Sequence, residues 1–350
     1  MSFNDLSDRE RQILRILTDH YINTAEPVAS RAIAKNYDLN LSAASIRNTI
    51  KDLEDLGLVR QPHTSAGRIP TIEGYRLYVD YLLHPEELSD LEKEQIKNRI
   101  SKEYSGIDQL LEQTSRVLGS VSHQLGVAIS PKFDSGIITR LELIPVAERR
   151  VLVVVAMRSG LARTILLEVE TDLGDYSLLE TASVLNERLC GLTVGEIRRT
   201  LKKRLSETAK GDPRLIRMFI DSSEELLENS PQSEVHIGDT RHILNQPEFK
   251  DSSKIRDFID LVEERKTMIE LVSRAGIVEG ICVTIGVEGG GSGGDKDLAE
   301  SKDFSLMSST YSAGKFKGIL GIIGPTRMPY SKLVSVVDYT AKRLSEILSE

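Results

Sequence analysis

Apolar residues recur at helical spacing in four stretches of the first 83 residues. After Ser7, apolar side chains return every three or four positions, and Glu10 completes a capping box with Ser7 that favours a helix start. The third stretch follows a Ser42 cap and ends at Gly57, a residue suited to the left-handed backbone beyond a helix. The pattern therefore predicts helices after Ser7 and at residues 30–37, 43–56 and 72–83.

A hairpin with a tight loop is predicted between the last two of these helices. Residues 58–61 form a short strand-like segment, and residues 69–71 are expected to run back alongside it as the second strand of the hairpin. The loop between them consists of small residues around Gly67. The order helix, helix, helix, hairpin predicts a winged helix-turn-helix domain over residues 1–85.

Beyond this domain the pattern alternates between helical and strand-like blocks. Residues 86–105 predict a charged linker helix, and a mainly helical block at 176–274 separates two blocks rich in β-branched residues. This order predicts an α/β domain, made of residues 106–175 and 275–350, that is interrupted by an inserted domain; two consecutive domains would fit the same pattern. The predicted fold class is therefore a multidomain α+β protein. Strands are expected at 136–145, 150–157, 161–169, 280–287, 303–312 and 316–323.

Composition and charge narrow the class of protein. The 350 residues carry a net charge of −8, so any contact with nucleic acid must come from a local surface. Cys190 and Cys282 stand far apart in apolar surroundings, which fits two buried thiols better than a disulfide framework or a metal site. The longest apolar run, residues 151–157, is too short to span a bilayer, and the polar start resembles no secretory signal. We therefore expect a soluble cytoplasmic protein.

The helix predicted at 43–56 separates into two chemically different faces. Ile46, Ile50, Leu53 and Gly57 share one stripe, which we expect to face the domain core. Arginine can bind guanine with two hydrogen bonds, asparagine can pair with adenine, and a small residue permits close approach to a base edge. The opposite face carries these residue types: Ala44, Arg47, Asn48, Lys51 and Asp55.

Hydroxyl and cationic residues add expected phosphate contacts. Ser42 and Ser45 lie at the helix start, where backbone N–H groups also favour anions. The loop around Gly67 carries residues suited to phosphate or the minor groove, namely His63, Thr64, Ser65 and Arg68. A solvated helix face is ordinarily rich in Lys, Arg and Asn, and residues 1–83 hold ten basic and eleven acidic side chains. The helix order and the wing, rather than charge, therefore favour DNA binding.

Several runs of residues resemble the heat-inducible transcription repressor family (HrcA). The most specific are Gln-Pro-His-Thr-Ser-Ala-Gly-Arg-Ile-Pro-Thr at 61–71 and Gly-Ile-Ile-Gly-Pro-Thr-Arg-Met-Pro-Tyr at 321–330. The further matching runs are residues 26–31, 42–48, 52–54, 246–249 and 285–286. The resemblance therefore extends over nearly the whole chain.

The resemblance implies a function and an architecture. It implies a winged helix, a GAF-like domain and a dimerisation domain inserted into the GAF-like domain. It also implies repression of chaperone operons at an inverted-repeat operator, with activity maintained by the chaperonin and lost on heat stress. Because an inverted repeat is matched by two-fold protein symmetry, we expect a homodimer. The glycine-rich stretch at 288–295 departs from the family, whose members carry a less glycine-heavy loop there.

A few motifs bear on functions other than DNA binding. The stretch at 288–295 lacks a Gly-Lys-Ser/Thr ending and opens no helix, so it does not match a phosphate-binding loop. Pro325 fits a strand that ends in a turn better than an anion site. The six histidines do not cluster at ligand spacing, and no catalytic motif is visible, so we expect neither enzyme activity nor a cofactor. A ligand-sensing regulator remains open and predicts a closed apolar pocket. A structural protein without DNA binding would leave the wing residues unexplained.

Overall fold

Three β-sheets and their helices make up the described part of the chain, and they fall into two compact units. Unit 1 comprises Met1–Ile129, Val235–Tyr311 and Ile319–Ile347, and unit 2 comprises Ser130–Glu234, Ser312–Gly318 and Leu348–Glu350. This computed structural model describes residues 5–64, 66–101, 106–131, 136–158, 162–169, 174–206, 208, 210–223, 235–275, 280–288, 300–314 and 316–349. The glycine-rich stretch expected at 288–295 lies outside the described residues from 289 onward.

The winged helix predicted at the N-terminus is confirmed. Apolar side chains of α1 and α3 form its core, with Ile13 and Leu53 fully buried. The two wing strands pair antiparallel, with Val59 opposite Pro70. The elements are α1 (Asp8–Thr24), α2 (Ser30–Asn36), α3 (Ala43–Asp55), β1 (Val59–Arg60), β2 (Ile69–Pro70) and α4 (Ile72–Leu77), which a π-helical turn (Tyr78–Leu82) continues.

One residue of the expected core stripe lies elsewhere. Ile46, Ile50 and Leu53 are buried as predicted, but Gly57 is exposed and lies beyond the end of α3. Its φ of 73° places it in the left-handed region, where it ends the helix, so the helical period does not extend to it. Thr49 is buried in the stripe instead, with its hydroxyl donating to the Ser45 carbonyl at 3.2 Å.

The five-stranded sheet of unit 1 combines segments from both ends of the chain. Its strand order is β7-β3-β10-β9-β8, and β3 pairs antiparallel with both β10 and β7. Neither β3 nor β7 is among the predicted strands. The strands are β3 (Leu125–Ile129), β7 (Val235–Ile237), β8 (Ile281–Glu288), β9 (Glu300–Ala313) and β10 (Phe316–Pro325).

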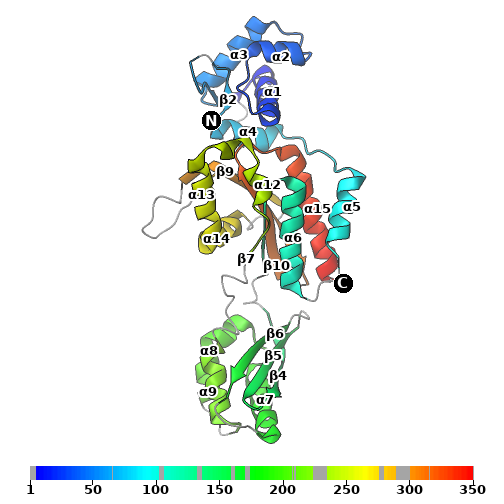
Figure 1. Cartoon of the computed structure of the whole chain (residues 1–350), viewed down its shortest axis with the longest axis vertical. Helices are drawn as coiled ribbons and strands as arrows, with labels where there is room; N and C mark the ends of the chain where they lie inside the picture. Colours follow the sequence, from blue (N-terminus) through cyan, green and yellow to red (C-terminus); the bar gives the residue numbers. More distant parts are fainter. Residues whose placement is uncertain are drawn as a thin grey trace. The chain divides into compact units, whose positions relative to one another are not determined.

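Helices cover both faces of this sheet. Figure 1 shows α13 and α14 on one side and α6 and α15 on the other, with α5 outside them. On the α13 side, a buried cluster joins Phe258 of α13 and Met268 of α14 to Phe304 and Leu306 of β9. These helices are α5 (Asp90–Arg99), α6 (Ile107–Ser122), α13 (Ser252–Glu263), α14 (Arg265–Ala275) and α15 (Tyr330–Ser349), with the short α12 (Arg241–Leu244) and a 3-10 turn (Pro247–Lys250) beside α13.

Unit 2 contains a separate three-stranded antiparallel sheet in the order β4-β5-β6. One face packs against helices, because Val153 and Val155 of β5 share a buried cluster with Leu185 and Ile197. Cys190 and Cys282 are free thiols, and both are half-buried rather than fully buried. The elements of unit 2 are β4 (Ile138–Ala147), β5 (Arg150–Met157), β6 (Ala162–Glu168), α7 (Asp175–Leu189), α8 (Val194–Ser206) and α9 (Pro213–Asp221).

The two units divide the chain at positions that differ from the expected domain boundaries of 175 and 274. The strands β4, β5 and β6 were expected in the interrupted α/β domain, but in the described part of the chain they form their own sheet and belong to unit 2. Conversely, α13 and α14 were expected in the inserted block, but they cover the five-stranded sheet of unit 1. The physical reason is strand pairing, which local periodicity does not specify. Among the described residues, no helix is both long and apolar enough to span a membrane.

Candidate nucleic-acid interface

The helix α3 presents the predicted polar face to solvent. Ser42 caps its start by accepting a hydrogen bond from the Ser45 N–H at 3.1 Å. The buried stripe holds the helix against α1 and α2, so the opposite side points outward. The predicted face is confirmed to be exposed at each of its positions: Ala44, Arg47, Asn48, Lys51 and Asp55.

A groove runs between α3, the start of α2 and the wing. It has a volume of about 410 Å³ and brings together Arg47 and Lys51 of α3 with Arg68 of the wing. Ser30, at the start of α2, lies on the same wall. Three of the predicted cationic residues therefore line one concave surface, although they lie up to 21 positions apart in sequence.

Arg68 has a structural partner that the sequence analysis missed. Its Nη2 lies 2.9 Å from Oε2 of Glu54, and the two side chains are 24% and 30% exposed. Its backbone pairs with Val28 through two hydrogen bonds of 2.8 and 2.9 Å. The buried Arg68 Nε has no hydrogen-bond partner among the described residues. Arg68 therefore ties the wing to α3, and a phosphate at this position would share the guanidinium with Glu54.

Backbone geometry explains the composition of the wing. A Cβ on Gly67 would lie 2.4 Å from the carbonyl carbon of Val28, so only glycine allows the wing to approach the backbone at Val28. The side-chain amide of Gln61 donates to the carbonyls of Thr64 and Ala66, each at 3.0 Å. These bonds close the loop from inside.

The tip of the wing is available for contact. His63 and Thr64 are both exposed, as a residue that touches DNA must be, and Ser65 lies outside the described residues. Gln61 and Glu54 are the two structural residues of this surface that the sequence analysis did not select. A weak signal existed for both, because Glu54 ends the family-like run at 52–54 and Gln61 begins the run at 61–71. Among the described residues, no group of three His, Cys, Asp or Glu side chains is placed to hold a metal ion.

The fold and this surface define a winged-helix DNA-binding protein, and family comparisons agree. The model described as "Winged helix-turn-helix transcription repressor, HrcA DNA-binding" matches residues 5–80, and the model described as "HrcA protein C terminal domain" matches residues 108–334. The chain belongs to the HrcA family of heat-inducible transcription repressors.

Full-length relatives and one solved structure are similar to the chain. The protein named "Heat-inducible transcription repressor HrcA" from Chlorobium phaeobacteroides (strain BS1) is 39% identical over 100% of both chains. The protein of the same name from Geobacter sulfurreducens is 38% identical, with 98% of each chain covered. A crystal structure described as that of a hypothetical protein has a TM-score of 0.63 at 24% identity and covers 98% of this chain and 99% of its own. That structure supports the fold.

Proposed function

We propose that this repressor binds an inverted-repeat operator of heat-shock chaperone operons as a homodimer. The single observation that carries the proposal is the exposed face of α3, with Arg47 and Lys51 lining a groove that ends at the wing. A helix of this kind reads base edges in the major groove with its N-terminal turns, while flanking residues bind phosphate. In this proposal Arg47 or Asn48 reads a base and Lys51 and Arg68 contact phosphate.

Base-by-base binding measurements test this assignment. An operator is first selected from random duplex DNA with the wild-type protein, and its single-base variants are then compared in gel shifts. Arg47→Ala should weaken binding by about 1–3 kcal/mol and relax specificity at one base pair. Lys51→Ala should weaken binding to all variants alike and reduce the salt dependence. Arg9→Ala is the matched control, because Arg9 is exposed on α1 outside the groove. An unchanged specificity profile for Arg47→Ala would remove Arg47 from the base-reading set.

An apolar row on unit 2 supports the homodimer. In the three-stranded sheet, Ile144 lies opposite Leu152, and Leu152 lies opposite Leu166. Ile144 and Leu166 are 39% and 44% exposed, while the neighbouring positions Val151 and Val153 point to the helices and are buried. We call Ile144, Leu152 and Leu166 the open row. Association of two copies through the open row would bury this surface and give the two-fold symmetry that an inverted repeat requires.

Dependence on the chaperonin is supported by the long-range pairing of the five-stranded sheet. Residues 125–129 of β3 pair with residues 319–323 of β10. In the sequence, the residues of unit 2 lie between these two neighbouring strands. Pairing of this kind closes late in folding and leaves apolar strands exposed. Operator binding after refolding should therefore recover further with chaperonin and ATP than without them. Equal recovery would count against this part of the proposal.

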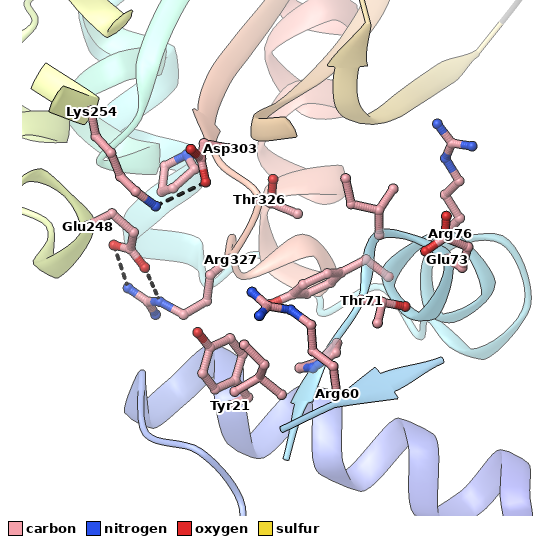
Figure 2. A pocket seen from close by; sticks show the side chains of 15 residues that line it. Tyr21, Arg60, Thr71, Glu73, Arg76, Glu248, Lys254, Asp303, Thr326 and Arg327 are labelled. Atoms are coloured by element: carbon pink, nitrogen blue, oxygen red, sulfur yellow. Dashed lines mark hydrogen bonds and ion pairs between the residues drawn. The ribbon is translucent and has the colours of Figure 1, made fainter. Parts of the chain in front are cut away.

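We assign the proposed GAF-like domain to the five-stranded sheet with helices on both faces. A ligand-sensing role for it would predict a closed apolar pocket. The cavity beside this sheet in Figure 2 is lined by charged and hydroxyl side chains instead, among them Arg60, Glu73, Lys254 and Asp303. This cavity therefore does not favour the ligand-sensing alternative.

A further inference from the structure

The winged helix rests on the five-stranded sheet domain at a surface built from residues far apart in sequence. A cavity of about 430 Å³ lies at this surface, with Tyr21 and Arg60 from the winged helix and Glu248, Lys254 and Arg327 from the sheet domain around it (Figure 2). The recognition surface on α3 does not use these residues. Among them, Arg327 makes a hydrogen bond to the DNA-binding domain.

Arg327 spans the surface. Its Nε lies 2.5 Å from Oε1 of Glu248 and its Nη2 lies 3.2 Å from Oε2, so the carboxylate is bound by two hydrogen bonds. The side chains of Arg327 and Glu248 are only 14% and 18% exposed. Burial alone would lower the pKa of Arg327, but the hydrogen bond and charge of Glu248 outweigh burial and raise it. Arg327 therefore keeps its charge, and the two hydrogen bonds fix its guanidinium against the Glu248 carboxylate.

The third contact of Arg327 reaches the DNA-binding domain. Its Nη1 donates to the backbone carbonyl of Ile22, in the last turn of α1. The carbonyls at this end of a helix carry partial negative charge and favour a cation. Because α1 packs directly against α3, fixing the end of α1 also fixes the recognition helix.

A second hydrogen bond holds the same helix. Tyr78 donates from its hydroxyl to the carboxylate of Asp19 on α1, and this hydroxyl lies 3.5 Å from Oγ of Ser331. Burial raises the pKa of Tyr78, so the hydroxyl stays a donor over the physiological range. Tyr78 and Asp19 both belong to the winged helix, so this bond holds α1 within its own domain, and the 3.5 Å contact with Ser331 of α15 is what reaches the sheet domain.

Three of the family-like motifs take no part in the proposed DNA contacts, and they lie at this surface. Glu248 belongs to the run at 246–249, and Arg327 belongs to the run at 321–330. The run at 285–286 also contributes. Arg76 donates to the Ile285 carbonyl at 3.4 Å, and a Cβ on Gly286 would lie 2.8 Å from Cδ1 of Ile72. All three motifs therefore contact the winged helix directly or through Arg327.

We propose that Arg327, held by Glu248, is a positioning residue that fixes the orientation of the winged helix on the sheet domain. In the homodimer this orientation sets the distance between the two recognition helices, and so the half-site spacing that the repressor accepts. The inference rests on the proposed function, because spacing has a meaning only for a dimer on an inverted repeat. Arg327 does not touch DNA in this scheme.

The test compares half-site affinity with spacing preference in the full-length protein. The probes are one half-site duplex and an inverted repeat selected from random DNA by the wild type, together with copies whose spacer is lengthened or shortened by one to three base pairs. Arg327→Ala and Glu248→Gln should bind the half-site within about twofold of wild type while their preference for the selected spacing falls about fivefold or more. Arg327→Lys keeps the charge but replaces the planar guanidinium with a single ammonium nitrogen, and should retain part of the preference.

A neighbouring ion pair provides the matched control. Lys254 Nζ lies 3.0 Å from Oδ1 of Asp303 in the same cavity, but both residues belong to the sheet domain. Lys254→Gln should therefore leave the spacing preference unchanged. Thermal unfolding of each variant distinguishes a variant that fails to fold from one whose winged helix is no longer held in place. Glu248→Gln is the mildest change, because glutamine has nearly the same shape as glutamate.

Each outcome decides the inference. If the Arg327 and Glu248 variants keep the wild-type preference, even with a lower melting temperature, the pair is only structural and the inference is overturned. If wild type binds the half-site but shows no spacing preference, the homodimer of the proposed function fails and the inference fails with it. If wild type selects no duplex sequence at all, the DNA-binding assignment itself is wrong.

Discussion

The five-stranded sheet and the three-stranded sheet differ in how many of their faces helices cover. In the first, α13 and α14 cover one face and α6 and α15 the other, so apolar side chains on both sides of the strands are buried. In the second, helices cover one face, and the open row lies on the other. The first sheet is therefore complete within one copy of the chain, whereas the second has an apolar surface that a further copy can bury.

The largest expected effect tests the fully covered sheet. Phe304 is 2% exposed, and its ring centroid lies 5.8 Å from that of Phe258 and 6.2 Å from that of Phe249. Phe304→Ala removes the shared centre of this cluster and should lower the free energy of unfolding of unit 1 by about 3–5 kcal/mol. Urea unfolding followed by hydrogen exchange on peptides of β9 and β5 reports each sheet separately.

The matched change on the other sheet is Leu166→Ala. Because Leu166 is 44% exposed, this substitution should change the free energy of unfolding of unit 2 by less than about 0.5 kcal/mol in protein diluted to the monomer. Similar losses for Phe304→Ala and Leu166→Ala would contradict the contrast between a covered and an open face.

The second prediction tests the occupant of the open face. Leu166→Glu places a charge in the middle of the surface that we propose a second copy buries, and full burial of a leucine is worth about 1.5–3 kcal/mol. The dimer dissociation constant should therefore rise by about tenfold to a hundredfold, measured by sedimentation velocity over a concentration series.

Leu91→Glu is the control for that experiment. Leu91 lies on α5 and is 65% exposed, so it carries the same side chain on a different surface. We expect its dimer dissociation constant to match wild type. An unchanged constant for Leu166→Glu, or an equal change for both variants, would place the dimer interface elsewhere.

Local patterns located most strands but did not assign them to sheets. The strand expected at 150–157 is β5 (Arg150–Met157), because its many β-branched residues favour a strand. The strand β3 was missed because its five residues are all buried and follow a helix directly, so no alternation separates the two. Its partner β10 lies about 190 residues later, and no local signal specifies that pairing.

The site shows the same division between local and distant information. The exposed face of α3 was predicted because helical periodicity alone decides which side is buried. The partner of Arg68 could not be predicted, since Glu54 lies 14 positions away on another element. The end of a strand at Pro325 was predicted and is confirmed, but the contact of Arg327 with Ile22 was not predicted, because it spans 305 positions. Contacts of that range depend on tertiary packing.

The smallest expected effect concerns α5, the helix that lies outside α6 and α15 on the five-stranded sheet. Glu92 of α5 lies 2.5 Å from Nζ of Lys332 on α15, and this contact, with hydrogen bonds from Ser89, lowers the pKa of Glu92 to about 2. The ordinary value is 4.5, so the carboxylate stabilises the fold above about pH 4.5 and loses this contribution as the pH falls toward 2. Solvent screening keeps the loss in free energy of unfolding for Glu92→Gln at about 0.5 kcal/mol at pH 7.

Asp338→Asn, which breaks a pair within α15 alone, is the control. Urea unfolding at pH 7 and pH 3 should show the difference between wild type and Glu92→Gln shrinking at the lower pH, and a difference that grows instead would mean that α5 is held by other contacts.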